Sequence, residues 1–301
     1  DCVAYDLLTL ANTNVCWPYS RLTVTMELHN IHKICPLSGF TLNIEEISGL
    51  EVAMLQRKRE ENLPGKLLFW GKIFGTTQDY LVVLYIDSSD EFPVKKYYYC
   101  TTSDYTLRAV PQLSTEYESQ AEGIALQFTG DPSFMAYNGE EPEEPVDPDD
   151  PDAPPPKEVF REVHRLSFII KQIDHDCSVI PRGALVVDAT KKVIFNNYYT
   201  GLSYHTSAEL RAFSHFRFPE NPQGIAAMKK PGIIKADFLD CITKDVPTEM
   251  WTVCHNSSGT ASYIRNLYWE GYNFYAMIGT SEYGGAYFGT GVPNLDLAFM
   301  L

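Results

Sequence analysis

Three residues spaced three positions apart have side chains that can bind zinc: His29, His32 and Cys35. On a helix, residues three or four positions apart lie on one face, so the three could reach a single ion. A structural zinc site has four protein ligands, however, and no fourth stands at a usual spacing. We interpret them as helix-face residues that contact core and solvent, and we predict no metal and no cofactor.

A second group that could do chemistry combines carboxylates, an imidazole and a thiol in one run: Asp174, His175, Asp176 and Cys177. Adjacent residues of a strand point to opposite faces, so these groups would not converge on one substrate atom. We predict a turn with Asx hydrogen bonds here. The sequence also lacks a GxSxG elbow, a phosphate-binding loop with its lysine and an HExxH pair. We therefore predict no catalytic residues and no enzymatic activity.

Length and charge limit the classes of protein to which the chain can belong. Its 301 residues are enough for one large domain or two smaller ones, and 45% are hydrophobic, which is ordinary for a globular protein. The formal net charge of −15 disfavours nucleic acid and anionic membranes as partners. The first residues lack the basic start and apolar core of a secretion signal, so we expect a cytoplasmic location.

The cysteines support an intracellular protein. There are seven, an odd number, and none forms a CxxC pair. Scattered thiols in a chain of this size are typical of reduced, buried side chains that pack as small hydrophobic groups.

The clearest boundary is an acidic, proline-rich linker, predicted at 137–157. Eight carboxylates and no basic residue lie between Glu140 and Asp152, and seven prolines lie between Pro142 and Pro156. Prolines lack an N–H and the carboxylates repel one another, which favours an extended, solvated chain. The alternative is that the segment lies along a basic surface of a partner.

Residues 1–65 are predicted to be an N-terminal helical segment. Apolar residues follow a helical spacing from Ile44 to Leu55, after a candidate N-cap at Thr41 or Asn43. The stop signal is the stretch from Asn62 to Gly65. The basic residues Arg57, Lys58 and Arg59 offset the dipole at the helix C-terminus, and a docking patch for an acidic neighbour is the alternative interpretation.

Residues 66–136 are predicted to be a β-rich first half. Apolar runs separated by turn-forming residues indicate about four antiparallel strands. The expected strands are Leu67–Phe74, Tyr80–Ile86, Lys95–Thr101 and Tyr105–Val110. A short helix at Ser114–Ile124, capped by Ser114 or Thr115, is expected to follow.

Residues 158–301 are predicted to be a β-rich second half, which could share one domain with the first. Val163–Ile173 fits both a helix and a strand, and we favour a strand, followed by Val179–Asp188 and Val193–Tyr199. Pro181 cannot donate to a ladder, so we expect it at an edge or bulge, with Arg182 aimed out of the sheet. A helix is expected from Ser203 or Ser207 to Phe216.

The last 41 residues are rich in aromatic side chains and indicate a β-meander. Strand-length runs are broken by Glu270-Gly271, Gly279-Thr280 and the run Gly289 to Gly291. Too many positions are apolar for one face to meet water, so we expect both faces to be covered. The predicted fold class is α+β, with antiparallel meanders and hairpins, the N-terminal helical segment and a few packed helices.

Four blocks in the same order resemble the radial spoke head protein 9 family of ciliary and flagellar axonemes. Together they extend over Lys66 to Leu301. The blocks are Phe69-Trp70-Gly71-Lys72-Ile73 with Gly75, Asp79 and Tyr80; Phe128-Thr129-Gly130-Asp131-Pro132; Ile180-Pro181-Arg182-Gly183-Ala184-Leu185; and Tyr283, Tyr287-Phe288-Gly289-Thr290-Gly291, Asn294-Leu295-Asp296-Leu297 and Phe299-Met300-Leu301.

The resemblance implies a non-enzymatic structural subunit of the radial spoke head. Such a subunit scaffolds contact between the radial spokes and the central pair apparatus and helps regulate dynein-driven motility. The implied location is the axoneme of a cilium or flagellum. The implied partners are other head subunits, notably paralogues of the protein 4 and protein 6 type, a second copy of the chain, and the central pair projections.

Interface residues are predicted within the matched blocks and the C-terminal aromatic stretch, because aromatic and arginine side chains dominate hot spots. They are Trp70, Arg182, Trp269, Tyr283, Tyr287 and Phe299. Core packing is the alternative for each aromatic residue. The alternative function is a cytoplasmic enzyme or small-ligand binder with an aromatic pocket around Trp269, Tyr275 and Tyr283, which would require convergent polar groups.

Overall fold

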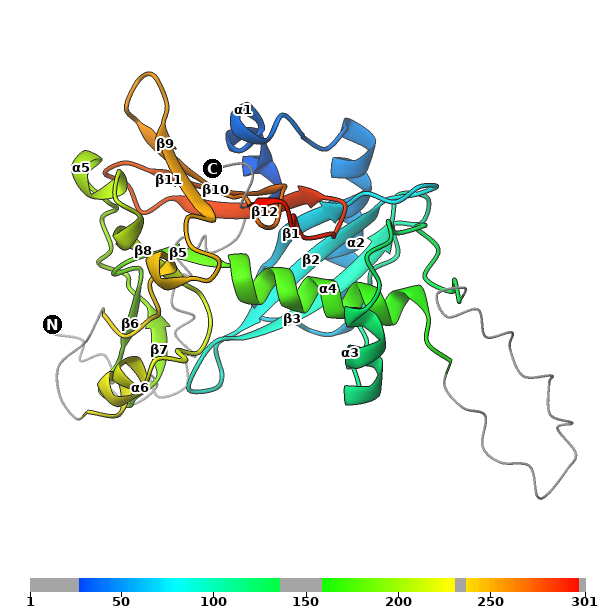
Figure 1. Ribbon diagram of the computed structural model, residues 1–301, viewed down its shortest axis with the longest axis horizontal. Coiled ribbons are helices and arrows are strands. Elements are labelled where there is room, and N and C mark those ends of the chain that lie inside the picture. The colour runs from blue at the N-terminus through cyan, green and yellow to red at the C-terminus, as the bar shows by residue number, and fades with distance from the viewer. Residues whose placement is uncertain (1–26, 136–158, 231–236, 298–301) are drawn as a thin grey trace, which may run out of the picture.

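The computed structural model describes residues 27–135, 159–230 and 237–297 (Figure 1). The first half contains η1 (Leu28–Lys33), α1 (Cys35–Ser38), α2 (Ile44–Glu60), β1 (Leu67–Ile73), β2 (Tyr80–Asp87), β3 (Val94–Thr101), β4 (Arg108–Ala109) and α3 (Thr115–Glu122). The second half contains α4 (Glu162–Cys177), β5 (Val179–Pro181), β6 (Leu185–Val187), β7 (Val193–Phe195), α5 (Tyr204–Ser207), η2 (Leu210–Ala212), β8 (Phe213–His215), α6 (Pro222–Lys229), η3 (Ile242–Lys244), β9 (Trp251–His255), β10 (Ala261–Asn266), β11 (Tyr272–Met277) and β12 (Tyr283–Gly289).

One eight-stranded sheet joins the two halves of the chain. Its order is β4-β3-β2-β1-β12-β11-β10-β9, so the first hairpins and the C-terminal meander lie side by side. Every neighbouring pair is antiparallel except β1 and β12, which run parallel, with Gly71 opposite Tyr287. The predicted antiparallel first sheet and C-terminal meander are confirmed, and the α+β class with them. The two smaller sheets pair β5 with β8 and β6 with β7.

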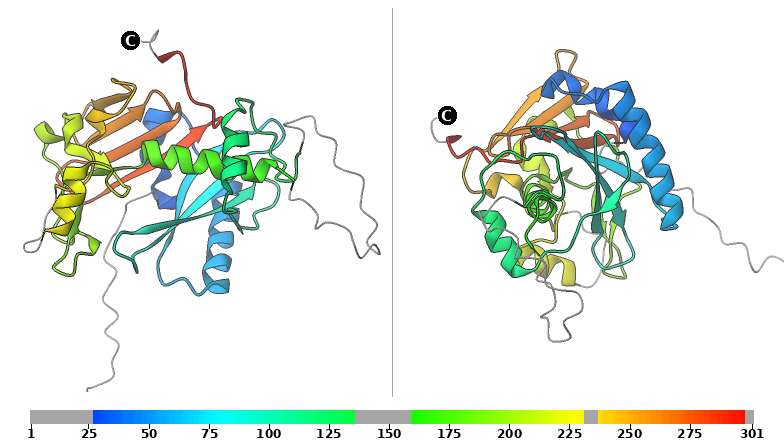
Figure 2. Two further views of the ribbon diagram at one scale, coloured as in Figure 1. Left: turned by 60° about the horizontal axis from the view of Figure 1, so that its bottom comes forward. Right: turned by 90° about the vertical axis from the view of Figure 1, so that its right-hand side faces the viewer.

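Helices cover both faces of the large sheet (Figures 1 and 2). One core contains α4 side chains together with Phe274, Tyr283 and Tyr287. The other contains α2 side chains together with Tyr275 and Phe288. Because successive residues of a strand face opposite sides, the aromatic run of β11 serves both cores. This confirms the expectation that both faces of the meander are covered.

The N-terminal helix forms where its cap and stop signals predicted it. Asn43 accepts a hydrogen bond from the N–H of Glu46, and the Glu46 carboxylate accepts one from the N–H of Asn43, which is a capping box. At the other end Arg57 pairs with Glu61 at 2.6 Å and lies over the ring of Tyr98. Arg57 is thus engaged within the molecule. Residues 1–26 of the predicted helical segment lie outside the described residues.

The predicted strand at Val163–Ile173 is wrong, because this stretch lies within the 16-residue helix α4. Its buried apolar residues recur at helical spacing: Leu166, Ile169, Ile170, Ile173 and Cys177. The strand preference of β-branched and aromatic residues gives way to burial of this stripe against the sheet. The predicted Asx turn at Asp174–Cys177 is likewise wrong, because these residues form the last turn of the helix.

The predicted helix up to Phe216 is also wrong. Ser203 caps only the four-residue α5, and the chain then forms β8, which pairs with β5. The stretch predicted as one strand from Val179 to Asp188 divides into β5 and β6, which belong to different sheets. The pairing of β5 with β8, which is distant in the sequence, makes the end of the predicted helix a strand, and the local pairing of β6 with β7 separates β6 from β5. Within the described residues, no helix is long and apolar enough to span a membrane.

Two further expectations in the first half have different outcomes. The short helix after the first sheet is confirmed as α3, and the side chain of Ser114 accepts a hydrogen bond from the N–H of Tyr117. The strand expected at Tyr105–Val110 is much shorter, since only Arg108 and Ala109 form β4. The predicted linker at 137–157 lies outside the described residues.

Candidate functional site

Four of the predicted interface residues lie in the core rather than at the surface. Trp70, Trp269, Tyr283 and Tyr287 are each at most 5% exposed. Trp70 Nε1 donates to Asp174 Oδ1 at 3.4 Å, and its ring packs against that of Tyr287 at 5.8 Å between centroids. These four aromatic side chains therefore pack in the core of the described structure, which is the alternative given for each of them above. Phe299 lies outside the described residues.

Arg182 is the predicted interface residue whose charge reaches the surface. It follows β5, and its backbone N–H donates to the carbonyl of Ala212 at 2.8 Å, which fixes the backbone at the end of the small sheet. Its side chain is about half exposed, and Nε lies 3.3 Å from Oδ1 of the more exposed Asp237. Exposed ion pairs of this kind are weak, so the pair with Asp237 adds little to the stability of the fold.

The residues of the aromatic-pocket alternative do not surround one space. Trp269 and Tyr283 belong to the core on the α4 side of the sheet, whereas Tyr275 belongs to the core on the α2 side. All three side chains are buried. The sheet therefore separates Tyr275 from the other two.

The residues that could have bound zinc or formed a catalytic cluster have other contacts. Among the described residues, no three His, Cys, Asp or Glu side chains gather closely enough to hold a metal ion. Nδ1 of His32 lies 2.8 Å from the carbonyl oxygen of His29, as helix-surface residues do. The five cysteines in the described ranges are free.

Two matched blocks are joined by the buried carboxylate of Glu162 at the start of α4. It accepts hydrogen bonds from the Tyr80 hydroxyl at 2.7 Å, the Thr129 N–H at 2.9 Å and the Gly130 N–H at 2.8 Å. Gly130 has φ +95°, and a Cβ there would lie 2.2 Å from the carbonyl oxygen of Gln78. These contacts give a structural reason for Tyr80, Thr129 and Gly130 in the matched blocks: the three residues hold the start of α4 in place.

The polar groups at the end of α4 point in different directions. The Asp174 carboxylate pairs with Lys95 of β3, while Asp176 Oδ2 accepts a hydrogen bond from Trp269 Nε1 at 2.8 Å. His175 Nε2 lies 2.8 Å from Glu220 Oε1. The groups connect α4 to the sheet on one side and to the loop after β8 on the other, and they do not face one common substrate position.

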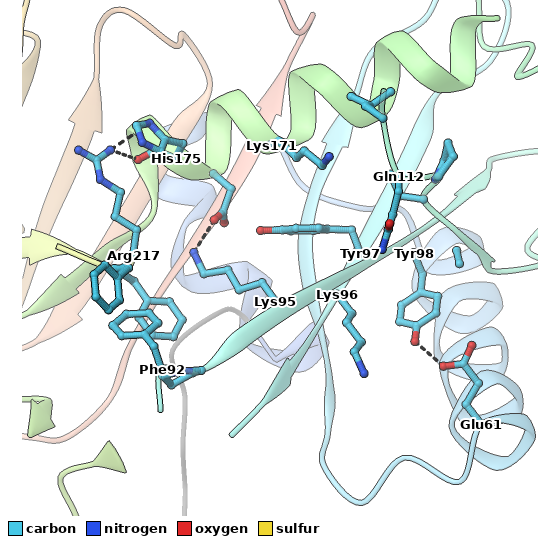
Figure 3. Close-up of a pocket in the computed structure, with 18 residues that line it drawn as sticks. Glu61, Phe92, Lys95, Lys96, Tyr97, Tyr98, Gln112, Lys171, His175 and Arg217 are labelled. Carbon is cyan, nitrogen blue, oxygen red and sulfur yellow. Dashed lines mark hydrogen bonds and ion pairs between the residues drawn. The ribbon is translucent and has the colours of Figure 1, made fainter. Parts of the chain in front are cut away.

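A hollow lies between β3 and α4 and opens at the edge of β3, and we call it the β3 groove (Figure 3). Its volume is about 790 Å³. It is lined by Glu61, Phe92, Pro93, Lys95, Lys96, Tyr97, Tyr98, Ala109, Val110, Pro111, Gln112, Leu113, Lys171, Asp174, His175, Phe216, Arg217 and Phe218. Lys171 on α4 lies across the groove from Tyr97 on β3. The loop after β4 forms a further wall.

Burial changes the acidity of the groups at the floor of the groove. It lowers the pKa of Lys95, and the neighbouring Asp174 carboxylate offsets part of that effect. Burial likewise raises the pKa of Tyr97 well above its ordinary value, and Asp174 adds to the shift. The Lys95 ammonium also lies 4.6 Å from the centre of the Phe216 ring. The floor is therefore a buried ion pair surrounded by aromatic side chains.

Sequence reasoning did not single out the residues of the β3 groove. One signal was present: Lys95 and Lys96 precede three consecutive tyrosines within an acidic chain. Lys171, however, lies in a segment predicted as a strand, and only the folded helix brings it opposite β3.

The chain is similar over most of its length to proteins named radial spoke head protein 9 homolog. The Danio rerio protein is 32% identical over 280 residues, which are 91% of this chain and 99% of the relative. The Bos taurus protein is 30% identical and the Homo sapiens protein 29% identical, each over 265 residues, 88% of this chain and 95% of the relative. No known protein-family model matches the chain.

Proposed function

We propose a function that starts from family membership: the chain belongs to the radial spoke head protein 9 family, because two relatives that are 32% and 30% identical to it cover 91% and 88% of its length. This membership assigns it to the radial spoke head in the axoneme of a motile cilium or flagellum, within the cytoskeleton. Within that head, we propose that the chain is a scaffold. It holds the surface through which spokes contact the central pair apparatus, and so helps regulate dynein-driven bending.

A scaffold rather than an enzyme agrees with the arrangement of the polar groups. The buried carboxylates of Glu162 and Asp174 are engaged in hydrogen bonds and ion pairs that hold α4 against the sheet. Most of the aromatic side chains named above pack in two hydrophobic cores, one on each face of the large sheet. Such a rigid body suits a part that transmits force between neighbours.

The proposed direct partners are other head subunits of the protein 4 and protein 6 type, a second copy of the chain and the central pair projections. Arg182 is the proposed contact residue, because among the described residues its half-exposed guanidinium pairs with no carboxylate other than the exposed Asp237. A planar guanidinium pairs well with carboxylates at protein interfaces.

The experiment is electron cryotomography of axonemes from cells that lack the protein, beside cells restored with a tagged copy. We expect spokes without complete heads and irregular beating in the first, with both restored in the second. The tag should add density at the spoke tip. Complete heads in cells without the protein would contradict a scaffold role, and a tag elsewhere in the axoneme would contradict the location.

A separate observation distinguishes the scaffold from the ligand-binding alternative. The purified chain should associate with head subunits in solution, and small metabolites should not change its melting temperature. A metabolite that raises the melting temperature in a saturable manner would favour the ligand binder.

A further inference from the structure

We propose that the β3 groove binds an extended, carboxylate-bearing segment of a neighbouring protein, which adds to the open edge of β3 as a further strand. The inference deepens the proposed function and rests on the chain acting as a subunit among partners. Three features carry it: an unpaired stretch of strand edge, exposed apolar and basic side chains beside it, and a local charge opposite to that of the whole chain.

The edge of β3 is only partly covered. β4 pairs with β3 at Tyr98 and Tyr99, and the N–H of Val110 donates to the carbonyl of Tyr97 at 3.0 Å. Residues two apart in a strand direct their backbone groups to the same side, so the N–H and C=O of Lys95 face the groove as those of Tyr97 do. Among the described strands, none pairs with Val94–Lys96 on this side. An extended segment can extend the sheet at such an edge.

Apolar side chains line one end of the groove. The rings of Phe92 and Phe218 lie 6.1 Å apart, and those of Phe92 and Phe216 lie 6.0 Å apart. Phe218 is 49% exposed, so part of this apolar surface is open to solvent. An added strand would place every second side chain against this surface.

Basic side chains determine which segment fits. The lining contains four lysine and arginine residues against two carboxylates, although the chain as a whole has a net charge of −15. Lys95 is engaged by Asp174, but Lys171 is exposed and forms no salt bridge with any described residue. Lys96, which is exposed, lies 3.4 Å from the partly buried carboxylate of Asp87. The groove therefore attracts carboxylates that other faces of the chain repel.

The carboxylates come from another protein rather than from this chain. Its own acidic stretch contains seven prolines between Pro142 and Pro156, and proline has no N–H to donate to the strand. A second copy offers only the same proline-rich acidic stretch, so it is a poor occupant of the groove for the same reason. The occupant is thus an acidic segment of a different protein, with apolar residues at alternate positions and free backbone N–H groups.

The test measures fluorescence anisotropy of a labelled ten-residue peptide that alternates glutamate and valine, titrated with the purified full-length chain. We expect saturable binding that the Lys171→Glu variant weakens about tenfold, because a favourable charge becomes repulsive. The matched control is Lys244→Glu, which reverses an exposed lysine outside the groove and should leave the affinity within about twofold. A peptide N-methylated at alternate residues should lose binding, since it cannot complete the strand.

Three outcomes would overturn the inference. One is an equal affinity for a peptide that alternates lysine and valine, because the charge of the peptide would then not determine its binding. Another is unchanged affinity for the Lys171→Glu variant or for the N-methylated peptide. The third is peptide binding that strengthens tenfold when residues 137–157 are deleted, because the chain's own segment would then be the occupant. All these measurements use the isolated chain, so a negative result would not contradict its location in the spoke head. Electron cryotomography tests that location separately.

Discussion

Trp269 Nε1 donates a hydrogen bond to Asp176 Oδ2 at 2.8 Å and so ties the turn before β11 to the last turn of α4. The indole is 1% exposed, whereas Asp176 is partly buried. Burial raises the pKa of Asp176, but hydrogen bonds from His175 and Trp269 outweigh it, and the pKa is lower than usual. The bond therefore stabilises the ionised carboxylate at the junction of helix and sheet.

Replacement of the indole tests this bond. Trp269→Phe removes the donor and leaves a small cavity, so we expect a loss of about 3 kcal/mol in the free energy of unfolding, measured by urea denaturation. Asp176→Asn and the double variant complete a thermodynamic cycle. A coupling energy of about 1 kcal/mol is expected for the pair. A coupling of zero would mean that the indole contributes through packing alone.

Glu162 makes the second prediction. Its fully buried carboxylate accepts bonds from the N–H groups of Thr129 and Gly130 and from Tyr80. Glu162→Gln replaces one acceptor oxygen with an NH₂ group that faces those donors, so we expect a loss of about 2 to 4 kcal/mol in the free energy of unfolding. Glu116→Gln, on the exposed first turn of α3, is the control and should cost less than about 0.5 kcal/mol. Equal melting temperatures for the two variants would contradict the assigned role of Glu162.

His175 should make the stability of the folded protein depend on pH. Its hydrogen bond to Asp176 raises the pKa of the imidazole above 6.5, burial and Arg217 oppose the shift, and Glu220 supports it. A raised folded-state pKa means that the stabilisation is complete below about pH 6.5 and disappears as pH rises through the raised value. The stability difference between the wild type and His175→Gln should therefore be largest in mildly acidic solution. Melting curves of the two proteins between pH 5.5 and 8.5 measure this difference. A stability difference that grows as the pH rises would contradict the raised pKa of His175.

Short-range signals in the sequence predicted part of this fold, and long-range packing decided the rest. The helix α2 was located by the candidate caps Thr41 and Asn43, of which Asn43 is the N-cap, and by the stop signal from Asn62 to Gly65, which act within a few residues of each helix end. In α4 the strand preference around Phe168 opposed the helical stripe, and only burial against a sheet formed by both halves of the chain resolves the conflict. The β3 groove was not predictable either, because Lys95 and Lys171 meet only after that packing. Likewise, the sequence does not show whether an aromatic residue of a matched block will be buried in the core or exposed at an interface. Trp70, for example, is buried in the core.

Arg182 carries the last prediction. Arg182→Ala should weaken binding to protein 4 and protein 6 type head subunits by about tenfold or more, because a guanidinium at an interface often contributes at least 2 kcal/mol. Folding should be unaffected, since the side chain is about half exposed and its pair with Asp237 lies at the surface. Arg211→Ala is the matched control, because Arg211 is also exposed and pairs with a nearby carboxylate, Glu209, at 2.9 Å. Biolayer interferometry against the purified subunits measures the affinity, and a thermal melt checks the fold. If Arg182→Ala lowers the melting temperature as much as the affinity, the residue supports the loop after β5 rather than a partner.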